Sequence, residues 1–271
     1  MCAPPPLLRH PALAFVARWL PGASLQAMPD HATLNRWGAT CGLALPDERP
    51  LCFVPSPAGE CSAIAYERRI VEHAEIITRQ DSLHDLCNAL AWLRFPRTKA
   101  RLSALHVADG DVSAVHPNVR GARRDAATLL DESGAIVACA DPELVELWQS
   151  HGWRQLFHDR REEVERNMRI AVIGHGLAAK LFAPFPSLTA KALVLDVLSP
   201  PPSWPERSLE QALDDAADAW LDKHARTMSP RCLLPLPIAA WPGWDAQGRG
   251  AERFDDTAVF RPRRGSLELR S

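Results

Sequence analysis

The sequence predicts an α+β protein, namely a mainly helical single domain with a β-hairpin or a small antiparallel sheet. Two observations lead to this prediction. Several segments show separate amphipathic helical patterns, and short β-favouring runs lie between turn residues instead of alternating regularly with the helices. Such a mixture is typical of α+β folds. We expect one domain at 35–265, a partly helical N-terminal extension at 1–34 and a tail at 266–271.

The first half of the domain is predicted to contain two short strands and two helices. "RPLCFVP" indicates a strand, and "EIITR" (75–79) indicates another. Residues 82–95 form the clearest helical pattern, with Ser82 as a suitable N-cap. Pro96 disfavours helical geometry in the residue before it and should end this helix. A second helix is expected to begin near Thr98.

A hairpin is predicted at 125–140, "DAATLLDESGAIVACA". Two β-favouring runs flank the turn sequence at 131–134, where Gly134 can adopt a positive φ. Asp141 followed by Pro142 indicates the start of the next helix.

The rest of the chain is predicted to hold further helices and one terminal strand. Helical patterns cover 153–168 and 208–225, and the second of these has an acidic face. The segment after them is rich in proline and ends in a short β-favouring run, "TAVFR" (257–261).

Composition excludes several classes of protein. Apolar and charged residues make up 46% and 24% of the chain, and the formal net charge is −2. These values favour a folded protein and give no reason to expect a nucleic-acid partner. No apolar run approaches the roughly 20 residues that span a bilayer. We therefore expect a cytoplasmic protein without a membrane anchor; its oligomeric state does not follow from the sequence.

The segment "RIAVIGHGLAAKLF" resembles the start of a dinucleotide-binding unit, with Gly174, Gly176 and Ala179 in the required spacing. However, Pro184 and Pro186 shorten the following helix to about two turns, too little for a crossover between parallel strands. We expect no such crossover at 170–196 and no bound cofactor. The glycines would instead permit close packing or expose the imidazole of His175.

The predicted helix at 82–95 contains the main candidate site. His84, Asn88 and Trp92 follow one another at intervals of four residues and are expected to share a face, beside Asp85. A histidine next to a carboxylate, a carboxamide and an aromatic wall can act as a general base. The alternative is a structural helix with buried, satisfied polar side chains. The catalytic hypothesis requires this face to open onto a cavity that His106 also reaches.

Metal binding is not indicated by the spacing of possible ligands. The two-histidine helix of zinc peptidases would need histidine at position 88, and none of the seven cysteines forms a Cys-x-x-Cys pair. We expect well under one equivalent of tightly held metal per chain. A His-Asp phosphohydrolase remains an alternative because His84 precedes Asp85, although the nearest upstream histidine, His73, lies only 11 residues before.

A cluster of arginines could hold an anionic substrate. "RGARRD" (120–125) places Arg123 and Arg124 in a predicted loop, and arginine binds phosphate and carboxylate groups through two parallel hydrogen bonds. A solvated turn with ion pairs is the alternative.

Four segments of the chain resemble a bacterial family called domain of unknown function 3025. These segments are "YERRIVEHAEIITRQDSLHDLCNALAWLRFPRTKARLSALH", "RRDAATLLDESGAIV", "GHGLAAKL" and "FDDTAVFRPRR", which occur in this order. The resemblance extends from about residue 35 to 265 and implies no particular reaction. It implies that these residues belong to recurring motifs: His84, Asp85, Asn88, Trp92, His106, His175 and Asp256.

The sequence supports three functional hypotheses. The first is an enzyme of hydrolase or transferase type for a polar or anionic small substrate, in which His84 transfers protons and Asp85 or Asn88 orients it. The catalytic group would also include His106 and His175, and substrate would contact Trp92, Arg123 and Arg124. The second is a non-catalytic module that binds a protein or RNA. The third is a metal-dependent phosphohydrolase.

Overall fold

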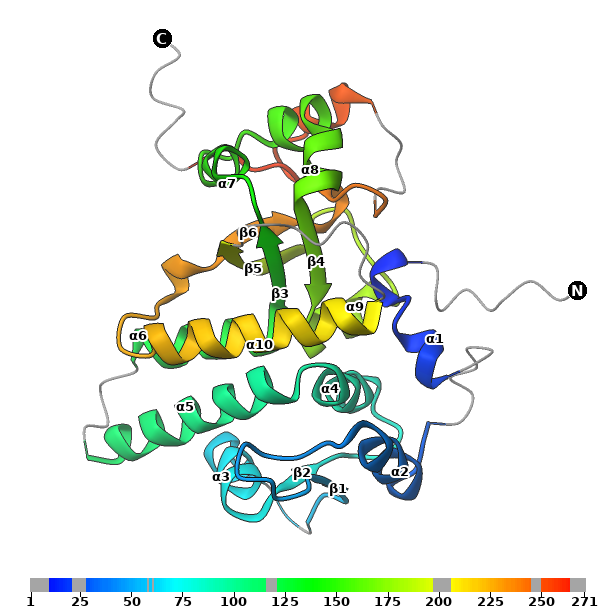
Figure 1. Ribbon diagram of the computed structural model, residues 1–271, viewed down its shortest axis with the longest axis vertical. Coiled ribbons are helices and arrows are strands. Elements are labelled where there is room, and N and C mark those ends of the chain that lie inside the picture. Colours follow the sequence, from blue (N-terminus) through cyan, green and yellow to red (C-terminus); the bar gives the residue numbers. More distant parts are fainter. Residues whose placement is uncertain are drawn as a thin grey trace, which may run out of the picture.

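The computed structural model confirms the α+β class, since many helices surround two small sheets (Figure 1). It describes residues 10–20, 28–57, 59, 61–115, 121–196, 206–244 and 250–263, with the backbone alone at 111–115 and 206–208. The α-helices are α1 (Val16–Trp19), α2 (His31–Cys41), α3 (Ala63–His73), α4 (Leu83–Arg94), α5 (Pro96–Val115), α6 (Ala122–Ser133), α7 (Pro142–Gln149), α8 (Arg161–Asn167), α9 (His175–Leu181) and α10 (Glu206–His224). The strands are β1 (Cys52–Val54), β2 (Glu75–Ile77), β3 (Gly134–Cys139), β4 (Met168–Val172), β5 (Thr189–Asp196) and β6 (Leu234–Pro237).

The larger sheet is mixed. Its strand order is β4-β3-β5-β6, in which β3 runs antiparallel to β4 and parallel to β5, and β5 runs antiparallel to β6. All six residues of β3 are buried, as expected for a central strand covered on both faces. The smaller sheet consists of β1 and β2 in parallel.

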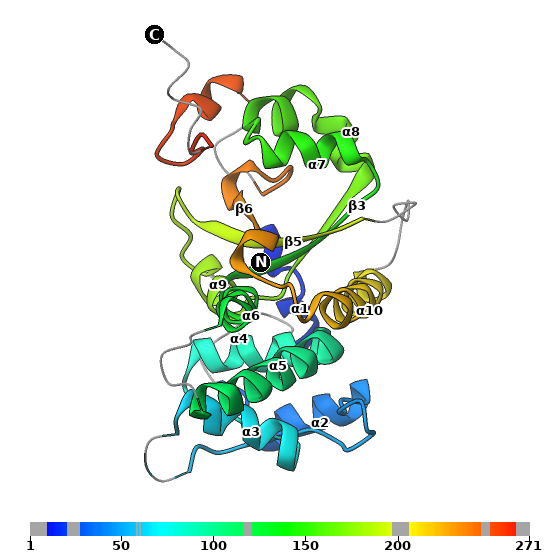
Figure 2. The ribbon, with the colours of Figure 1, turned by 90° about the vertical axis from the view of Figure 1, so that its left-hand side faces the viewer.

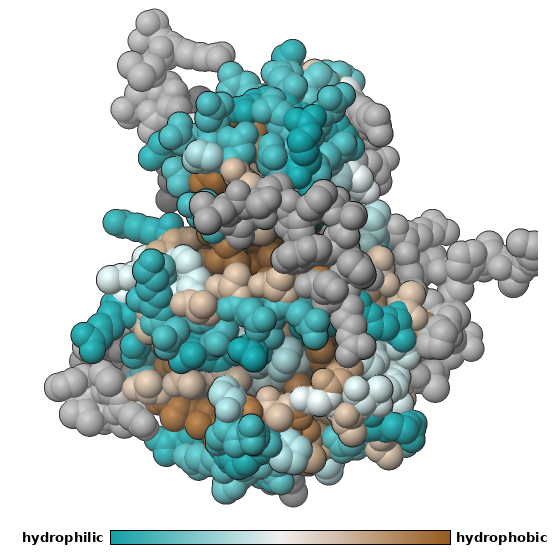
Figure 3. Space-filling model, viewed as in Figure 1, coloured by the Kyte–Doolittle hydropathy of each residue, from teal (hydrophilic) through white to brown (hydrophobic). Residues whose placement is uncertain are grey.

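Helices separate the two sheets. Figure 1 shows α5 and α10 side by side across the middle of the molecule, with the four-stranded sheet on one side and β1, β2, α2 and α3 on the other. Figure 2 shows α7 and α8 at the far end of the larger sheet, and α4, α6 and α9 grouped near its other end. In the view of Figure 3, hydrophilic residues cover α7 and α8. The group of α4, α6 and α9 positions the site described below.

The predicted elements of the first half are confirmed. The strands at β1 and β2 form, and Ser82 caps α4 by accepting a hydrogen bond from the backbone N–H of Asp85 at 3.2 Å. The helix ends before Phe95, and α5 begins directly at Pro96, two residues earlier than expected. Proline is well suited to this first helical position because it has no N–H that needs a partner there.

The hairpin predicted at 125–140 is wrong. Residues up to Ser133 form α6, and only the second run becomes a strand, β3. Ala126, Ala127 and Leu130 lie on the buried face of α6, and alanine and leucine are strong helix formers, so local propensity and packing both favour the helix. The backbone at Gly134 is extended, with φ at −79°, and therefore forms no turn.

The terminal strand predicted at 257–261 is wrong. The segment 257–261 forms turns instead of a strand, in which the carbonyl of Asp256 accepts hydrogen bonds from Val259 and Phe260.

The absence of a parallel crossover at 170–196 is confirmed for the described residues. Strands β4 and β5 lie on opposite sides of β3 and run in opposite directions, so the short helix α9 connects no parallel pair.

Two of the predicted helices of the second half, α7 and α10, are confirmed. Asp141 caps α7 by accepting from the N–H of Glu143 at 3.0 Å, and α10 covers the expected 208–225 region. The helix expected at 153–168 is divided into a π-helical turn (Gln155–Asp159) and α8. In the part of the chain that the structure describes, no helix has the length and apolar character needed to cross a membrane.

The contact between α10 and the start of α5 predicts a pH dependence of stability. Asp214 accepts hydrogen bonds from the N–H groups of Arg97 and Thr98 at 3.0 and 2.8 Å, and burial raises the pKa of Asp214 to about 6. Because this pKa is raised by folding, the contribution to stability is lost as the pH rises through about 6. We expect the free energy of unfolding to fall by roughly 2 kcal/mol between pH 4 and 6.5.

The variant Asp214→Asn isolates this effect, since asparagine can still accept hydrogen bonds at a helix N-terminus but does not titrate. Its stability, measured by urea unfolding, should vary less across this pH range than that of the wild type. Parallel pH profiles of the two proteins would contradict the assignment.

Candidate functional site

A cavity of about 700 Å³ lies between α3, α4, α6 and α9. Its described lining combines titratable and polar side chains from segments far apart in the sequence. The lining residues are Ser56, Gly59, Cys61, Ala63, Tyr66, Glu67, Ile77, Arg79, His84, Asp85, Asn88, Asp131, Glu132 and His175. A concave site with several converging polar groups is the usual setting of ligand binding or catalysis.

His84 projects from the first turn of α4 into this cavity, and its side chain is 46% exposed. Its two ring nitrogens face two different carboxylates. Nε2 lies 3.5 Å from Oε2 of Glu132, and Nδ1 lies 3.5 Å from Oδ1 of Asp85. The imidazole therefore lies open to a ligand and is not enclosed in the core.

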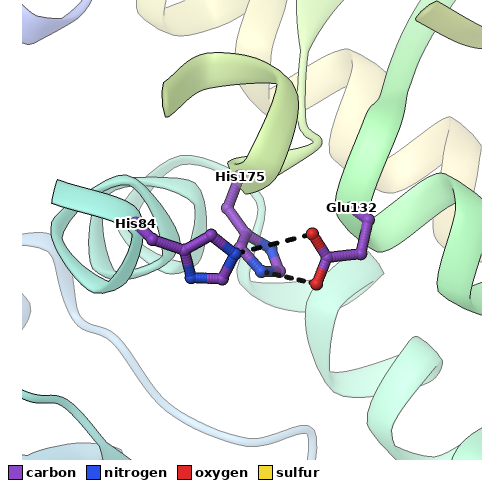
Figure 4. A group of neighbouring side chains, drawn as sticks. All are labelled: His84, Glu132 and His175. Atoms are coloured by element: carbon purple, nitrogen blue, oxygen red, sulfur yellow. Dashed lines mark ion pairs between the residues drawn. The ribbon is translucent and has the colours of Figure 1, made fainter. Parts of the chain in front are cut away.

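His175 approaches the same carboxylate from the first position of α9 (Figure 4). Its Nε2 lies 3.2 Å from Oε1 of Glu132, and its Nδ1 lies 3.6 Å from Oδ2 of Asp131. The ring is buried and meets the ring of His84 edge to face, with 4.5 Å between centroids. The imidazole of His175 also lowers the pKa of Glu132.

Two glycines permit this approach of α6 to α9. A Cβ atom at Gly176 would lie 2.5 Å from Oε2 of Glu132, and one at Gly174 would overlap the backbone of Ser133 and Gly134. Any larger residue at either position would push the two elements apart. The expectation that the glycines permit close packing is confirmed, and "GHGL" begins a helix.

A buried pair supports His175 from behind. Asp131 forms an ion pair with Lys99 of α5, whose ammonium lies 5.5 Å from the centroid of the Trp92 ring. Burial acts to raise the pKa of Asp131, but the charges of Lys99 and His175 outweigh it and hold this pKa below its usual value. Asp131 thus remains a carboxylate beside His175.

Asp85 is held by Arg79 at the edge of the cavity. The guanidinium donates through Nε at 3.0 Å and through Nη2 at 2.8 Å, and the backbone N–H of Arg79 donates at 2.7 Å. Burial alone would raise the pKa of Asp85, but these bonds lower it to about 2. Asp85 therefore stays ionised beside Nδ1 of His84.

Three polar side chains form the inner wall. Asn88 donates from Nδ2 to the hydroxyl of Tyr66 at 2.8 Å, while its Oδ1 is buried and has no hydrogen-bond partner. Burial and the charge of Asp131 raise the pKa of Glu67 to about 7. A carboxyl group that titrates near neutral pH is suited to proton transfer.

The structure brings only part of the predicted site together. His84, Asp85, Asn88 and His175 line one cavity. His106 is buried and is not among the lining residues, so the expectation that it reaches the cavity is wrong.

The expected binding residues lie elsewhere. Trp92 is fully buried in the core, which makes its predicted role as a cavity wall wrong. Arg123 belongs to α6 and pairs with Asp109, and neither it nor Arg124 lines the cavity, so the predicted anion clamp is wrong. Asp256 caps a turn through its own Oδ1, which accepts from Ala258.

Sequence reasoning missed Glu132 and Asp131, which it placed in the turn of the wrong hairpin. It also missed Lys99, Glu67 and Tyr66. A signal was present for the acidic pair, since the two carboxylates lie two and three residues before a wholly apolar strand, where the end of a helix can present them. Nothing in the local sequence related them to His175, 43 residues away.

His84, Glu132 and His175 are arranged so that together they could hold a metal ion. One ligand atom from each lies within 4.8 Å of the other two. In a tetrahedral zinc site with bonds of about 2.0–2.1 Å, neighbouring ligand atoms are about 3.3 Å apart. Glu132 lies 3.5 Å from His84 through Oε2 and 3.2 Å from His175 through Oε1, so each histidine faces a different oxygen of this carboxylate.

The distal nitrogens of both histidines strengthen this interpretation. Each Nδ1 lies near an aspartate, 3.5 Å from Asp85 for His84 and 3.6 Å from Asp131 for His175, although the buried Nδ1 of His175 makes no hydrogen bond to the described residues. Metal-ligating histidines commonly have a carboxylate at the second ring nitrogen, which fixes the tautomer that leaves the other nitrogen free to bind. Both histidines that face Glu132 thus have an aspartate near their second ring nitrogen.

Fold and cavity define an α+β protein with a histidine- and carboxylate-lined pocket between its helices. The chain belongs to the family described as protein of unknown function (DUF3025), whose model matches residues 51–264. This range contains His84, Glu132 and His175. Comparisons with curated proteins and with solved structures found no match.

Proposed function

We propose that the protein is a metal-dependent hydrolase, with zinc as the first choice of metal, bound by His84, His175 and Glu132. The observation that supports this most is the convergence of these three side chains, with an aspartate carboxylate near the Nδ1 atom of each histidine. Two histidines and one glutamate with a fourth position open to water are a common donor set of catalytic zinc, which lowers the pKa of its bound water to about 7.

The proposal changes the role that the sequence suggested for His84. As a ligand it holds the metal and does not transfer protons, and we assign proton transfer to Glu67, which lines the same cavity. It also differs from the expectation of a metal-free protein. That expectation rested on spacing within single helices, whereas these ligands come from α4, α6 and α9. We propose the cytoplasm as the compartment, since Cys52, Cys61, Cys87, Cys139 and Cys232 are free thiols.

Metal content tests the proposal directly. Purified protein, stripped with a chelator and dialysed against zinc, should bind close to one equivalent by elemental analysis. It should then hydrolyse activated ester or amide substrates, lose this activity on renewed chelation and regain it with zinc.

The variant Glu132→Gln removes the charged ligand and should lower zinc affinity and activity together. Glu163→Gln is the matched control, because Glu163 lies on α8 and pairs with Arg160 outside the cavity. Zinc uptake far below one equivalent in the wild type, without hydrolysis, would refute the proposal and favour the binding module.

A further inference from the structure

Arg79 has hydrogen-bonding groups that no described residue uses. Among the described residues that line the cavity, it alone has a permanent positive charge, and its side chain is 63% exposed. Its Nε and Nη2 atoms donate to the carboxylate of Asp85 along one edge of the planar guanidinium. The N–H groups of Nη1 and the second N–H of Nη2 form another edge, which has no acceptor among the described residues. This free edge can bind an oxyanion through two parallel hydrogen bonds.

Asp85 holds the guanidinium in place. The carboxylate also accepts from the backbone N–H of Arg79 at 2.7 Å and from the hydroxyl of Ser82 at 3.1 Å, so its own position is fixed. The guanidinium bound to it is therefore oriented before a ligand arrives, which reduces the conformational entropy lost on binding. This distinguishes Arg79 from an arginine whose side chain moves freely in solvent.

The charges of the cavity do not repel an anion once a metal is bound. Each of the two lining aspartates is paired with a cation, Arg79 or Lys99. A divalent metal exceeds the single negative charge of Glu132, and the pKa of Glu67 is about 7, so this carboxyl is partly neutral at neutral pH. The metal-bound site is therefore neutral to positive.

The free edge of Arg79 and the metal ligands lie on opposite sides of the His84 ring. Nε2 of His84 faces Glu132, whereas Nδ1 lies 3.5 Å from Asp85, which in turn holds Arg79. In Figure 4 the second ring nitrogen of His84 points away from Glu132. The width of an imidazole and of a carboxylate therefore separates the metal from the guanidinium. A molecule that contacts both must be elongated, with its anionic group several bonds away from the group at the metal.

We infer that Arg79 binds an anionic group, a carboxylate or a phosphate, at one end of an elongated substrate whose hydrolysed bond lies at the metal. The inference rests on the proposed function. It also gives the anionic substrate expected from the sequence a binding residue inside the cavity, in place of Arg123 and Arg124.

Hydroxamic acids that differ only in the end of their tails test the inference. Hexanohydroxamic acid has a neutral tail, adipic acid monohydroxamate a carboxylate, 5-phosphonopentanohydroxamic acid a phosphonate and 6-aminohexanohydroxamic acid an ammonium group. All four present the same metal-binding group, so differences in Kd for the zinc-loaded protein report contacts of the tail. We expect at least one anionic probe to bind about fivefold or more tightly than the neutral probe, and the ammonium probe to bind most weakly. The tighter of the two anionic probes identifies the preferred group.

Tail length tests the position of the anion site. Succinic acid monohydroxamate is too short to reach from the metal past His84 to Arg79. Its advantage over butanohydroxamic acid, which has a neutral tail of the same length, should therefore be smaller than the advantage measured with the longer pair.

Arg79→Gln should bring the Kd values of the anionic and neutral long probes close together. Asp85 keeps the backbone N–H of residue 79 and the hydroxyl of Ser82, and the neutral probe reports any general effect on the zinc site. Arg69→Gln is the matched control, because Arg69 also pairs with a carboxylate, Glu75, but lies outside the cavity lining. It should leave the preference for the anionic probe unchanged.

The outcomes separate the inference from the proposal on which it rests. Equal binding of neutral and anionic long probes to the zinc-loaded wild type, or an anion preference that persists in Arg79→Gln, would overturn the role of Arg79 and leave the metal site standing. A protein that neither takes up zinc nor binds any of the hydroxamates would overturn both.

Discussion

Replacing His84 with alanine is expected to lower zinc affinity by about 100-fold or more and hydrolysis by about 1000-fold. Loss of a ligand should exceed the 10–100-fold effect of losing a group behind a ligand. Metal stabilisation of a transition state amounts to several kcal/mol, and each 1.36 kcal/mol is a factor of ten in rate. Zinc affinity is measured by competition with a chelating dye, and hydrolysis is measured at saturating zinc.

The same substitution should hardly change the stability of the metal-free protein. The His84 side chain is about half exposed and faces carboxylates at 3.5 Å, so it provides few packing contacts to the core. We expect a change of less than about 1 kcal/mol in the free energy of unfolding. A structural histidine would instead leave buried partners without hydrogen bonds and cost about 1–3 kcal/mol.

An exposed histidine outside the cavity provides the control for His84→Ala. His73→Ala alters an exposed histidine at the end of α3 and should leave zinc affinity unchanged. If His84→Ala kept full zinc affinity but unfolded readily, α4 would be a scaffold and the metal centre would be wrong.

The residues of the site that lie close together in the sequence could be predicted, and those that lie far apart in the sequence could not. The capped helix at α4 was predictable because Ser82, the apolar stripe and Pro96 are local signals. His84 and Asn88, one turn apart, do line one cavity. Glu132 and His175 reach it only through the packing of α6 and α9, which no local pattern specifies.

The error at Trp92 has a geometric cause. Eight residues of helix amount to about 800° of rotation, which leaves Trp92 about 80° from His84, and to about 12 Å along the axis. The two side chains therefore point differently and lie at different depths. His84 lies at the exposed start of α4, while Trp92 lies in the core beside Lys99.

The hairpin was predicted because the turn signal at Gly134 was given more weight than the helix propensity of the residues before it. That run is rich in alanine and leucine, which are strong helix formers, and Ala126 and Leu130 are buried on the helical face. The partners of β3 are β4 and β5, which begin 34 and 55 residues after it. Because those strands satisfy both edges of β3, the preceding segment is free to form a helix that ends at the site.

Replacing Arg94 with methionine is expected to destabilise the protein by about 3–5 kcal/mol. Arg94 ends α4 and pairs with Glu210 of α10, and the two side chains are only 5% and 4% exposed. Its guanidinium also donates to the carbonyl of Val172 at 2.9 Å and lies 3.7 Å from the centroid of the Phe15 ring. Methionine leaves the buried carboxylate and carbonyl without this donor. The free energy of unfolding in urea measures the loss.

The neighbouring pair of Arg97 and Asp215 supplies the control for Arg94→Met. Its side chains are 65% and 62% exposed, so Arg97→Met should cost less than about 1 kcal/mol. The double variant Arg94→Met with Glu210→Leu should recover much of the loss, because it removes the buried charge together with its partner. A cost below 1 kcal/mol for Arg94→Met alone would mean that Arg18, 2.8 Å from Glu210, compensates that carboxylate by itself. The ion pair of Arg18 in α1 with Glu210 would then be the main polar contact that stabilises the packing of α1, α4 and α10.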